Sequence, residues 1–232
     1  MKTDLRGKTA VVTGAAGTMG RAVVSFLRED GLRVVGIDLR RTETSEVCDI
    51  TSPEQVREFV KAVGHVDVLV NNAGILSNNK AEATTPEEWR KVLAANLDGA
   101  FYLSREVIPG MKARRWGRIV NTCSLAAKTG GLTAGTAYAA SKGALTSLTF
   151  SLARELAPHG VTVNGISPAY VKTPMVTEGL TEVQRQALLA QIPVGRFCEP
   201  EEFAHVVRFL VSPLAGFITG EIVDLNGGLV MD

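Results

Sequence analysis

The sequence predicts one α/β domain over residues 1–232, a doubly wound parallel sheet in a three-layer α/β/α arrangement. Apolar, β-rich segments alternate with longer amphipathic segments from end to end, which is typical of repeated strand–helix–strand units. Hydrophobic residues make up 45% of the chain and charged residues 21%, enough apolar material for a sheet covered on both faces. No linker-like or repetitive segment interrupts this pattern.

Seven segments are expected to be strands because they are short, apolar and rich in β-branched residues. They are Thr9–Thr13, Arg33–Ile37, Val47–Asp49, Val66–Val70, Gly117–Cys123, Val161–Ile166 and Glu221–Asp224. The expected helices between them are Thr18–Asp30, Pro53–Val63, Pro86–Lys112, Thr136–Pro158 and Pro200–Val211. Ser52-Pro53 and Thr85-Pro86 mark two helix starts.

The connection between the second and third strands is unusually short. Only ten residues lie between Asp38 and Asp49. A crossover between parallel strands normally needs a dozen or more residues, so a loop or a single turn is expected in place of a helix.

The charge balance and the lengths of the apolar segments limit the partners and the cellular location that can be expected. A net charge of +1 gives no reason to expect nucleic acid or an anionic membrane as a partner. Arg114, Arg115 and Arg118 are expected to form a solvated turn around Trp116. The segment Met1–Arg6 has no apolar core of the signal-peptide type, and no later apolar run approaches ~20 residues. A cytoplasmic protein is expected.

No metal site is expected from the cysteines and histidines. The cysteines are too few and too scattered for a disulfide framework or a zinc site, and the histidines share no ligand spacing. These residues are Cys48, Cys123, Cys198, His65, His159 and His205. Cys123 follows a strand and has no histidine near it in sequence, so a buried structural thiol is expected.

A glycine-rich turn, Thr13–Gly20, follows the first strand and opens the first helix. Small residues there let the backbone approach a pyrophosphate, and a helix N-terminus favours its negative charge. Asp38 ends the next strand, where a carboxylate accepts hydrogen bonds from a ribose 2′-hydroxyl and repels a 2′-phosphate. This favours NAD. Arg40 and Arg41 follow and could reach a 2′-phosphate, so NADP is the less favoured alternative.

Tyr138 and Lys142 stand four residues apart in the expected helix Thr136–Pro158, and therefore on one face of it. A free tyrosine titrates near ~10, and a neighbouring ammonium that favours the phenolate would lower this pKa toward the range of efficient proton transfer. Ser124 lies upstream at the end of a strand, and Asn96 lies further back. Taken alone, the Tyr–Lys pair also fits a packed tyrosine and a solvated lysine.

Together these motifs resemble those of the classical short-chain dehydrogenase/reductase family, in that family's order, over essentially the whole chain from Lys8 to Gly228. The resemblance implies a Rossmann-type fold and hydride transfer between a nicotinamide cofactor and a carbonyl or secondary alcohol carbon. No metal is needed for this chemistry. The residues that match the family's catalytic tetrad are Asn96, Ser124, Tyr138 and Lys142.

The resemblance also implies a role for each member of the tetrad. Tyr138 would be the general acid or base, and Ser124 would hydrogen-bond the reacting oxygen. Lys142 would lower the Tyr138 pKa and bond the nicotinamide ribose. Asn96 would hold a water that connects Lys142 to solvent. Isolated from the motif, Ser124 would fit a local turn bond and Asn96 a polar kink in a helix.

Further segments match the family's cofactor contacts. Asn71–Gly74 resembles the segment beside the adenosine ribose, Asp49-Ile50 matches the adenine position, and Ser167–Met175 resembles the nicotinamide loop. The expected cofactor residues are Gly14, Ala16, Gly17, Thr18, Met19, Gly20, Asp38, Leu39, Asp49, Ile50, Asn72, Ala73, Gly74, Tyr138, Lys142, Pro168, Ala169, Val171 and Thr173. Two residues depart from the family pattern: Thr18 and Ala169 stand where glycines are usual. Alanine cannot take a positive φ cheaply, so ordinary dihedrals are expected at Ala169.

The expected substrate lining is mostly apolar and has no arginine clamp for a carboxylate or phosphate, which predicts a neutral or only locally polar substrate. The expected substrate residues are Ser124, Ala126, Gly131, Tyr138, Tyr170, Met175 and Val176, and the expected lining extends over Leu125, Gly130–Thr133 and the stretch up to Gln191. Tyr170 could cap the pocket or could be a packed aromatic.

Three functions fit the sequence. It is most similar overall to the 3-oxoacyl thioester (β-ketoacyl) reductases of the family, while Asp38 and the short loop after it resemble NAD-linked diol and alcohol dehydrogenases. A dinucleotide-binding sensor without turnover is the alternative of another class. The family is commonly tetrameric, so a homotetramer or homodimer is expected, through the Asn96 and Tyr138 helices and the segment Glu221–Asp232.

Overall fold

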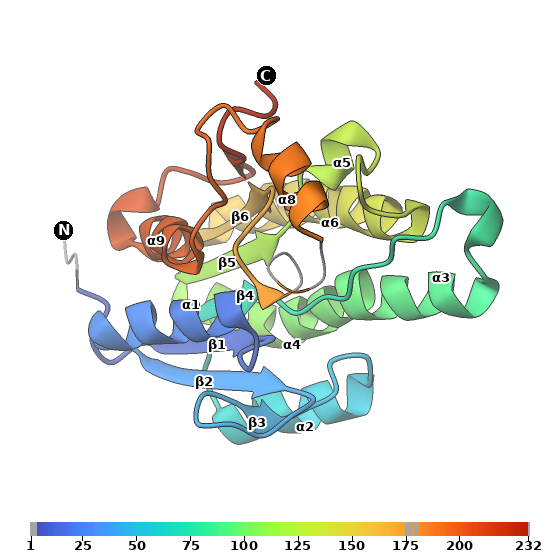
Figure 1. The fold of residues 1–232 in the computed structure, drawn as a ribbon. Helices are drawn as coiled ribbons and strands as arrows, with labels where there is room; N and C mark the ends of the chain where they lie inside the picture. Colours follow the sequence, from blue (N-terminus) through green and yellow to red (C-terminus); the bar gives the residue numbers. More distant parts are fainter. Residues whose placement is uncertain (1–3, 175–177, 179–180, 232) are drawn as a thin grey trace.

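The computed structural model describes residues 4–174, 178 and 181–231. Within these residues one sheet of seven strands, in the order β3-β2-β1-β4-β5-β6-β7, forms the centre of the molecule (Figure 1). All pairings are parallel. The strands are β1 Thr9–Thr13, β2 Arg33–Asp38, β3 Glu46–Val47, β4 Val68–Asn71, β5 Gly117–Thr122, β6 Val161–Pro168 and β7 Ile222–Leu225. The predicted doubly wound sheet is confirmed.

Side chains alternate along the strands between two cores. Ala10 and Val12 of β1 face the core that contains α1 (Thr18–Glu29) and α9 (Pro200–Val211). Val11 faces the other core, which is closed by three helices, α2 Pro53–Val63, α4 Gly99–Arg114 and α6 Thr136–Leu156. Burial on both faces explains why the strands read as nearly continuous apolar runs.

Proline at the first helical position marks two helix starts, as predicted. The Ser52 hydroxyl accepts a hydrogen bond from the Gln55 N–H at the start of α2. The Thr85 hydroxyl accepts one from the Glu88 N–H at the start of α3 (Pro86–Leu93). Such caps satisfy backbone donors that have no partner inside the helix.

The predicted helix Pro86–Lys112 is not one continuous α-helix. α3 ends at Leu93, a π-helical turn covers Ala94–Asp98, and α4 follows. π-Turns are rare and occur mostly at functional sites. Two helices were not predicted, α5 (Ala126–Thr129) and α8 (Glu182–Leu189). The remaining short 3₁₀ turns are Ala81–Ala83, Ala157–His159 and Pro213–Ala215.

The predicted solvated arginine turn is wrong for Arg118. Its side chain is buried, and its guanidinium carbon lies 4.6 Å from the centroid of the Trp116 ring. Burial lowers the pKa of Arg118 to about 10. Lys8 Nζ also lies over this ring, 3.6 Å from the centroid. Trp116 therefore joins the beginnings of β1 and β5 through two cation–π contacts.

Membrane insertion through a helix finds no support in the fold. Across the ranges 4–174 and 181–231, none of the helices combines the length and the apolarity that a bilayer crossing requires.

Candidate active site

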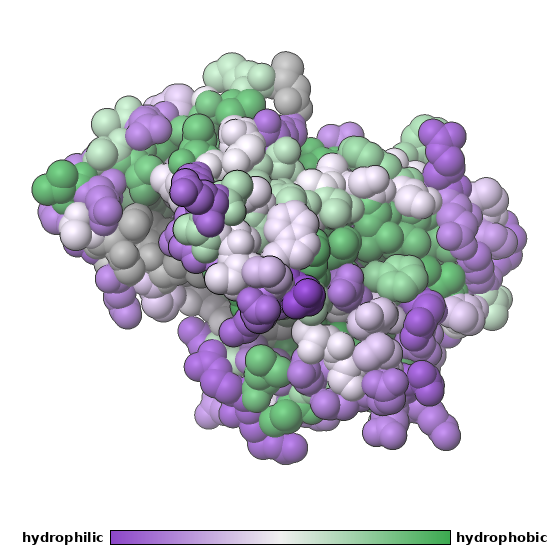
Figure 2. All heavy atoms as spheres, turned by 90° about the vertical axis from the view of Figure 1, so that its right-hand side faces the viewer, coloured by the Kyte–Doolittle hydropathy of each residue, from purple (hydrophilic) through white to green (hydrophobic). Residues whose placement is uncertain are grey.

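The predicted site residues that the structure describes lie at the carboxyl ends of the strands. Parallel α/β sheets bind ligands at the carboxyl ends of their strands, beside the point where the strand order reverses. In this sheet that point lies between β1 and β4. Figure 2 looks onto this side of the molecule and shows a continuous hydrophobic area among hydrophilic surroundings. Apolar surface exposed in this way often marks a binding site.

Tyr138 lies in the first turn of α6, and Ser124 follows the end of β5. Both side chains line one cavity, and the Ser124 hydroxyl accepts the Ala126 N–H at 3.1 Å. Burial raises the pKa of Tyr138 above its ordinary value, and hydrogen bonding by Ser124, which lowers this pKa, only partly opposes the effect. The phenol is therefore protonated at neutral pH, the state that donates a proton to a carbonyl oxygen.

Lys142 lies one turn further along α6 and is buried. Its Nζ donates a hydrogen bond to the Thr122 carbonyl at 2.7 Å and lies 5.8 Å from the centroid of the Tyr138 ring. Burial lowers the pKa of Lys142 to about 8. The prediction that Lys142 lowers the Tyr138 pKa is wrong for this structure, because the ammonium is bonded to the end of β5 and burial dominates at the phenol.

Asn96 lies in the π-helical turn and is buried. Its Oδ1 accepts the Ile75 N–H at 2.8 Å, and its Nδ2 donates to the Ile75 carbonyl and to the Ser141 hydroxyl, both at 3.0 Å. A Cβ added to Gly74 would lie 3.0 Å from Asn96 Oδ1 and 3.5 Å from Lys142 Nζ. Both polar groups therefore approach the backbone of Gly74, and the absence of a side chain there makes the closer approach of Asn96 easier.

The glycine-rich turn has the shape that a pyrophosphate needs. Gly14 has φ +66°, and a Cβ there would lie 2.9 Å from Ala73 Cα. A Cβ on Gly20 would lie 2.2 Å from the Gly14 carbonyl oxygen, so the turn packs closely against α1. Gly17 is the N-cap of α1 and supplies no side-chain cap, which leaves the first backbone N–H groups, from Thr18 through Met19, for a ligand. These features fit a dinucleotide.

Asp38 lies beside this turn. Its carboxylate accepts the Ala16 N–H at 3.2 Å and the Arg40 N–H at 3.3 Å, and Arg40 Nε lies 3.9 Å away. The neighbouring Leu39 is exposed. The predicted loop is confirmed: the chain between β2 and β3 is closed by backbone bonds between Thr42 and Ser45, with no helix. Asp38 is thus held where β2 meets the glycine-rich turn.

The adenosine-side residues are fixed by contacts along the sheet edge. The Thr13 hydroxyl accepts the backbone N–H groups of Asn72 and Ala73 at 2.9 and 2.8 Å, and Asn72 Nδ2 donates to the Thr13 carbonyl. Ile50 packs against Gly99 at the start of α4, where a Cβ would lie 2.6 Å from its Cδ1. Asp49 accepts the Thr51 N–H at 2.9 Å.

The expected nicotinamide loop leaves the end of β6. Pro168 ends that strand and its carbonyl accepts the Leu125 N–H, while the Ala169 N–H donates to the Leu225 carbonyl. Ala169 has no positive φ, so the expectation of ordinary dihedrals there is confirmed. Val171 forms a parallel bridge with Cys198, and Thr173 follows half-buried.

A cavity of about 690 Å³ opens beside Ser124 and Tyr138. Its lining is mostly apolar, as expected, and includes Ala126 and Tyr170. The Tyr170 ring meets Phe197 edge to face, so this residue both packs and lines the cavity. Gly131, which was expected in the lining, is not among the lining residues, and its carbonyl accepts a hydrogen bond from Lys80 Nζ at 3.0 Å. Met175 and Val176 lie outside the described residues.

Leu76 and Asn78, which follow the Asn71–Gly74 segment, line the cavity and were not predicted from the sequence. Gln184, Ala187 and Leu188 of α8 also line it, and they lie in the stretch up to Gln191 that was expected to contribute. Thr181 and Gln184 form a capping box at the start of α8. The Thr-x-x-Gln spacing was the available signal for this helix.

A metal centre finds no support at this site. In the part of the chain that the structure describes, no three His, Cys, Asp or Glu residues are grouped so that they could hold an ion. Cys123 is buried beside Ser124, and burial raises the pKa of its thiol, as expected of a structural cysteine.

Known proteins resemble this chain over almost its entire length. A family model described as Enoyl-(Acyl carrier protein) reductase matches residues 14–230. The 3-oxoacyl-(acyl-carrier-protein) reductase of Vibrio cholerae serotype O1 is 40% identical, over 98% of this chain and 99% of its own. The corresponding reductase of Rickettsia conorii is 38% identical, with the same coverage.

Solved structures share the fold. The crystal structure of gox2181 is 35% identical with a TM-score of 0.93, over 98% of this chain and 97% of its own. A putative NAD(P)-dependent gluconate 5-dehydrogenase from Beutenbergia cavernae, with bound NADP at low occupancy, is 36% identical with a TM-score of 0.89, over 99% of each chain. The chain therefore belongs to the classical short-chain dehydrogenase/reductase family and is an NAD(P)-dependent oxidoreductase that acts on CH–OH groups of small molecules.

Proposed function

We propose that this enzyme reduces the keto group of a 3-oxoacyl thioester. The observation that carries the proposal is that Ser124 and Tyr138 together line a mainly apolar cavity of about 690 Å³. Such a cavity takes an acyl chain, while the pair offers two polar groups to one carbonyl oxygen. The 40% identity to a 3-oxoacyl-(acyl-carrier-protein) reductase supports the same substrate class.

Each residue of the tetrad has a proposed task. Tyr138 donates its phenolic proton to the carbonyl oxygen, and Ser124 hydrogen-bonds that oxygen as negative charge develops on it. A nicotinamide, when bound, supplies the hydride to the carbonyl carbon. Lys142 holds the nicotinamide ribose, and Asn96, whose Oδ1 lies beside Gly74 close to Lys142 Nζ, orients the water through which Lys142 exchanges protons with solvent.

For the cofactor we propose NAD(H) over NADP(H). The two oxygens of the Asp38 carboxylate lie at the end of β2 and accept the backbone N–H groups of Arg40 and Ala16. At this position the negative charge of the carboxylate would repel a 2′-phosphate. The other cofactor residues predicted from the sequence keep their proposed roles. Asp38→Ser should weaken NADH binding and strengthen NADPH binding, measured by fluorescence titration. Unchanged preference in this variant would assign the choice to Arg40 or Arg41.

A second candidate function is NAD-dependent oxidation of a cyclic alcohol or diol. The similarity to the putative gluconate 5-dehydrogenase structure favours it, since that fold matches with a TM-score of 0.89.

The first experiment measures initial rates at the nicotinamide absorbance band. NADH and NADPH are tested with 3-oxoacyl thioesters, cyclic ketones and diketones, and NAD with the matching alcohols. Fastest turnover of a 3-oxoacyl thioester supports the proposal, and fastest turnover of a cyclic alcohol or diol supports the second function. Tyr138→Phe should lose at least ~10³-fold in kcat with cofactor affinity unchanged. No turnover of any of these substrates by the unaltered enzyme would contradict both proposed substrate classes.

Assembly as a homotetramer or homodimer is also proposed, in a reducing, cytoplasmic compartment. Two large apolar side chains, Phe101 of α4 and Phe150 of α6, are exposed, although both helices pack on the core with their opposite sides. Exposed apolar surface on two adjacent helices suits a second copy of the chain. Cys48, Cys123 and Cys198 are all free thiols, which fits a reducing environment.

A further inference from the structure

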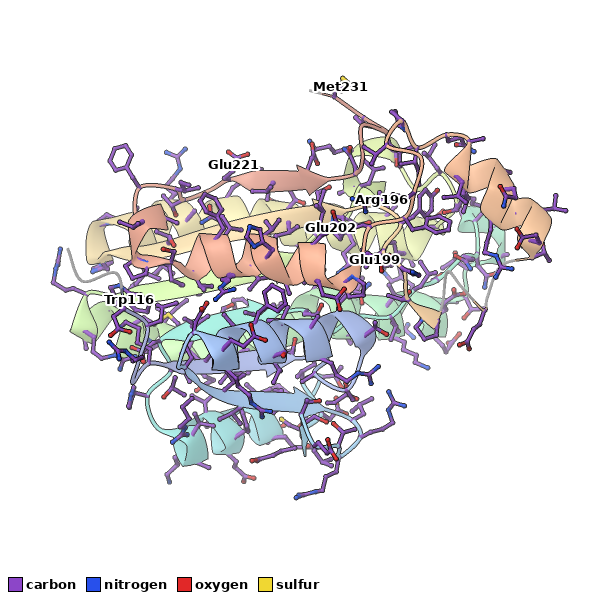
Figure 3. All side chains as sticks on the ribbon, turned by 60° about the vertical axis from the view of Figure 1, so that its left-hand side comes forward. Trp116, Arg196, Glu199, Glu202, Glu221 and Met231 are labelled. Carbon is purple, nitrogen blue, oxygen red and sulfur yellow. The ribbon has the colours of Figure 1, made fainter. Side chains whose placement is uncertain are left out.

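Four charged side chains meet where the chain after α8 reaches the start of α9. Arg196 forms a bidentate pair with Glu202, at 2.6 and 2.8 Å, and Glu202 Oε2 also accepts the Glu199 N–H at 2.9 Å. Lys172 Nζ lies 3.0 Å from Glu199 Oε1. Figure 3 shows Arg196, Glu199 and Glu202 together at this end of α9, far from Trp116. A bidentate guanidinium–carboxylate pair fixes orientation as well as distance.

A short series of contacts joins this cluster to the cavity. Arg196 Nη1 donates to the Phe197 carbonyl at 3.2 Å, and the Phe197 ring meets Tyr170 with centroids 6.4 Å apart. The Cys198 N–H donates to the Tyr170 carbonyl, and the Lys172 N–H donates to the Cys198 carbonyl. Tyr170 lines the cavity beside Ser124 and Tyr138. The position of its ring therefore depends on the segment that Arg196 holds.

α9 offers a rigid attachment for Arg196. Phe203, next to Glu202, is fully buried in the core shared with α1. Further along α9, Arg208 pairs with Asp30 at the end of α1. Glu202 is therefore a fixed point, and Arg196 fastens the cavity-side segment to it.

We propose that Arg196 and Glu202 form a latch that positions Tyr170 over the substrate cavity and so sets the affinity for the carbonyl substrate. Neither residue lines the cavity that contains Ser124 and Tyr138, so both are positioning residues. The inference rests on the proposed function of that cavity as the substrate site.

Kinetics of two variants test the latch. Arg196→Lys keeps the charge but loses the bidentate geometry, and Glu202→Gln loses the charge. Each should raise KM for the carbonyl substrate roughly 5- to 10-fold with kcat within about 2-fold, the pattern of lost substrate binding. The matched control is Arg33→Lys at the start of β2, remote from the cavity, which loses a guanidinium hydrogen bond to the Val63 carbonyl and should leave KM unchanged. An equal rise in KM for the control would overturn the proposal.

A double-mutant cycle tests the route through Tyr170. In a Tyr170→Ala background, Arg196→Lys should change KM by less than about 2-fold, because the group that the latch positions is gone. An undiminished effect in that background would overturn the proposal.

Hydrogen exchange tests the latch without turnover. Arg196→Lys should speed exchange of the Lys172 and Cys198 amides, which donate to the Cys198 and Tyr170 carbonyls, while the control Arg33→Lys should not. Unchanged exchange at these amides in Arg196→Lys would overturn the latch. If no carbonyl substrate turns over, the proposed function fails, and the exchange result still decides whether the latch exists.

Discussion

Burial acts on Tyr138 and Lys142 in the same sense, against the charged form of each. It raises the pKa of the phenol and lowers that of the ammonium to about 8. Ser124 opposes the effect at Tyr138 by its hydrogen bond. The Tyr138 phenol is therefore protonated at neutral pH and can donate its proton to a carbonyl oxygen. To accept a proton from an alcohol, Tyr138 must be a phenolate, which forms only at higher pH.

The two reaction directions should differ in their dependence on pH. Between about pH 6 and 8, reduction should show no titration of Tyr138, whose raised pKa keeps the phenol protonated. Oxidation should become faster as pH rises toward and beyond 10, since the phenolate fraction rises. Profiles of kcat/KM in both directions measure this. An oxidation rate that is flat over the whole range would contradict the assignment of Tyr138 as the base.

Lys142→Met should abolish activity and raise the melting temperature. The folded-state pKa of about 8 lies below the ordinary 10.5, so below pH 8 the buried ammonium destabilises the fold, and this cost disappears as pH rises from 8 to 10.5. Removing the charge should stabilise the protein by about 1–3 kcal/mol at neutral pH. This range already allows for the hydrogen bond to the Thr122 carbonyl that the variant loses.

Thermal unfolding at pH 7 and pH 10 measures this gain, which should shrink at the higher pH. Lys112→Met, on a partly exposed ion pair with Glu155, serves as the control and should change the melting temperature little. A melting temperature that falls equally in both variants would show that the ammonium is not costly where it lies.

At the level of elements, the glycine-rich turn and α1 act as one unit. A Cβ on Gly20 would lie 2.2 Å from the Gly14 carbonyl oxygen and 2.8 Å from Ala15 Cα, both backbone atoms that cannot turn aside. The close contact sets the position of the α1 N-terminus relative to β1. The geometry of the expected pyrophosphate site therefore depends on the absence of one methyl group.

Gly20→Ala should destabilise the protein by about 1–3 kcal/mol and weaken NADH binding, because the turn must move away from α1. Denaturant unfolding and fluorescence titration measure the two effects. Gly143→Ala in α6 is the matched control, since a Cβ there meets nothing within 4 Å. Equal effects on binding in both variants would contradict the role given to the close contact.

The sequence predicted those elements whose signals are local. Proline after Ser52 or Thr85 located the starts of two helices. The apolar run that contains Ala10, Val11 and Val12 predicted a strand buried on both faces. The π-turn at Asn96 was missed because its cause is the approach of Ile75 and Ser141, which are distant in sequence. The raised pKa of Tyr138 was missed for the same reason, because burial by residues distant in sequence causes it. Short helices such as α5 give too little periodicity to identify.

At the scale of the whole molecule, exposed apolar side chains bear on the proposed assembly. Phe150 should contribute to an interface between copies, since it lies exposed on α6 beside the open edge at β7. Phe150→Glu should lower the mass measured by light scattering after gel filtration, because a charge would be buried at the contact. Val47→Glu, an exposed position on β3 at the opposite edge of the sheet, should leave the mass unchanged. An unchanged mass for Phe150→Glu would place the interface elsewhere.

Trp116 gives the protein an intrinsic optical probe. Its indole stacks against Lys8 and Arg118, whereas the second tryptophan, Trp89, is part of α3 and more open to water. Figure 3 shows Trp116 at the end of the sheet remote from Arg196, so its emission should be insensitive to ligands at the cavity. Unfolding separates the ring from both cations and exposes it. A shift in the emission of a Trp89→Phe variant would therefore report the integrity of the sheet alone.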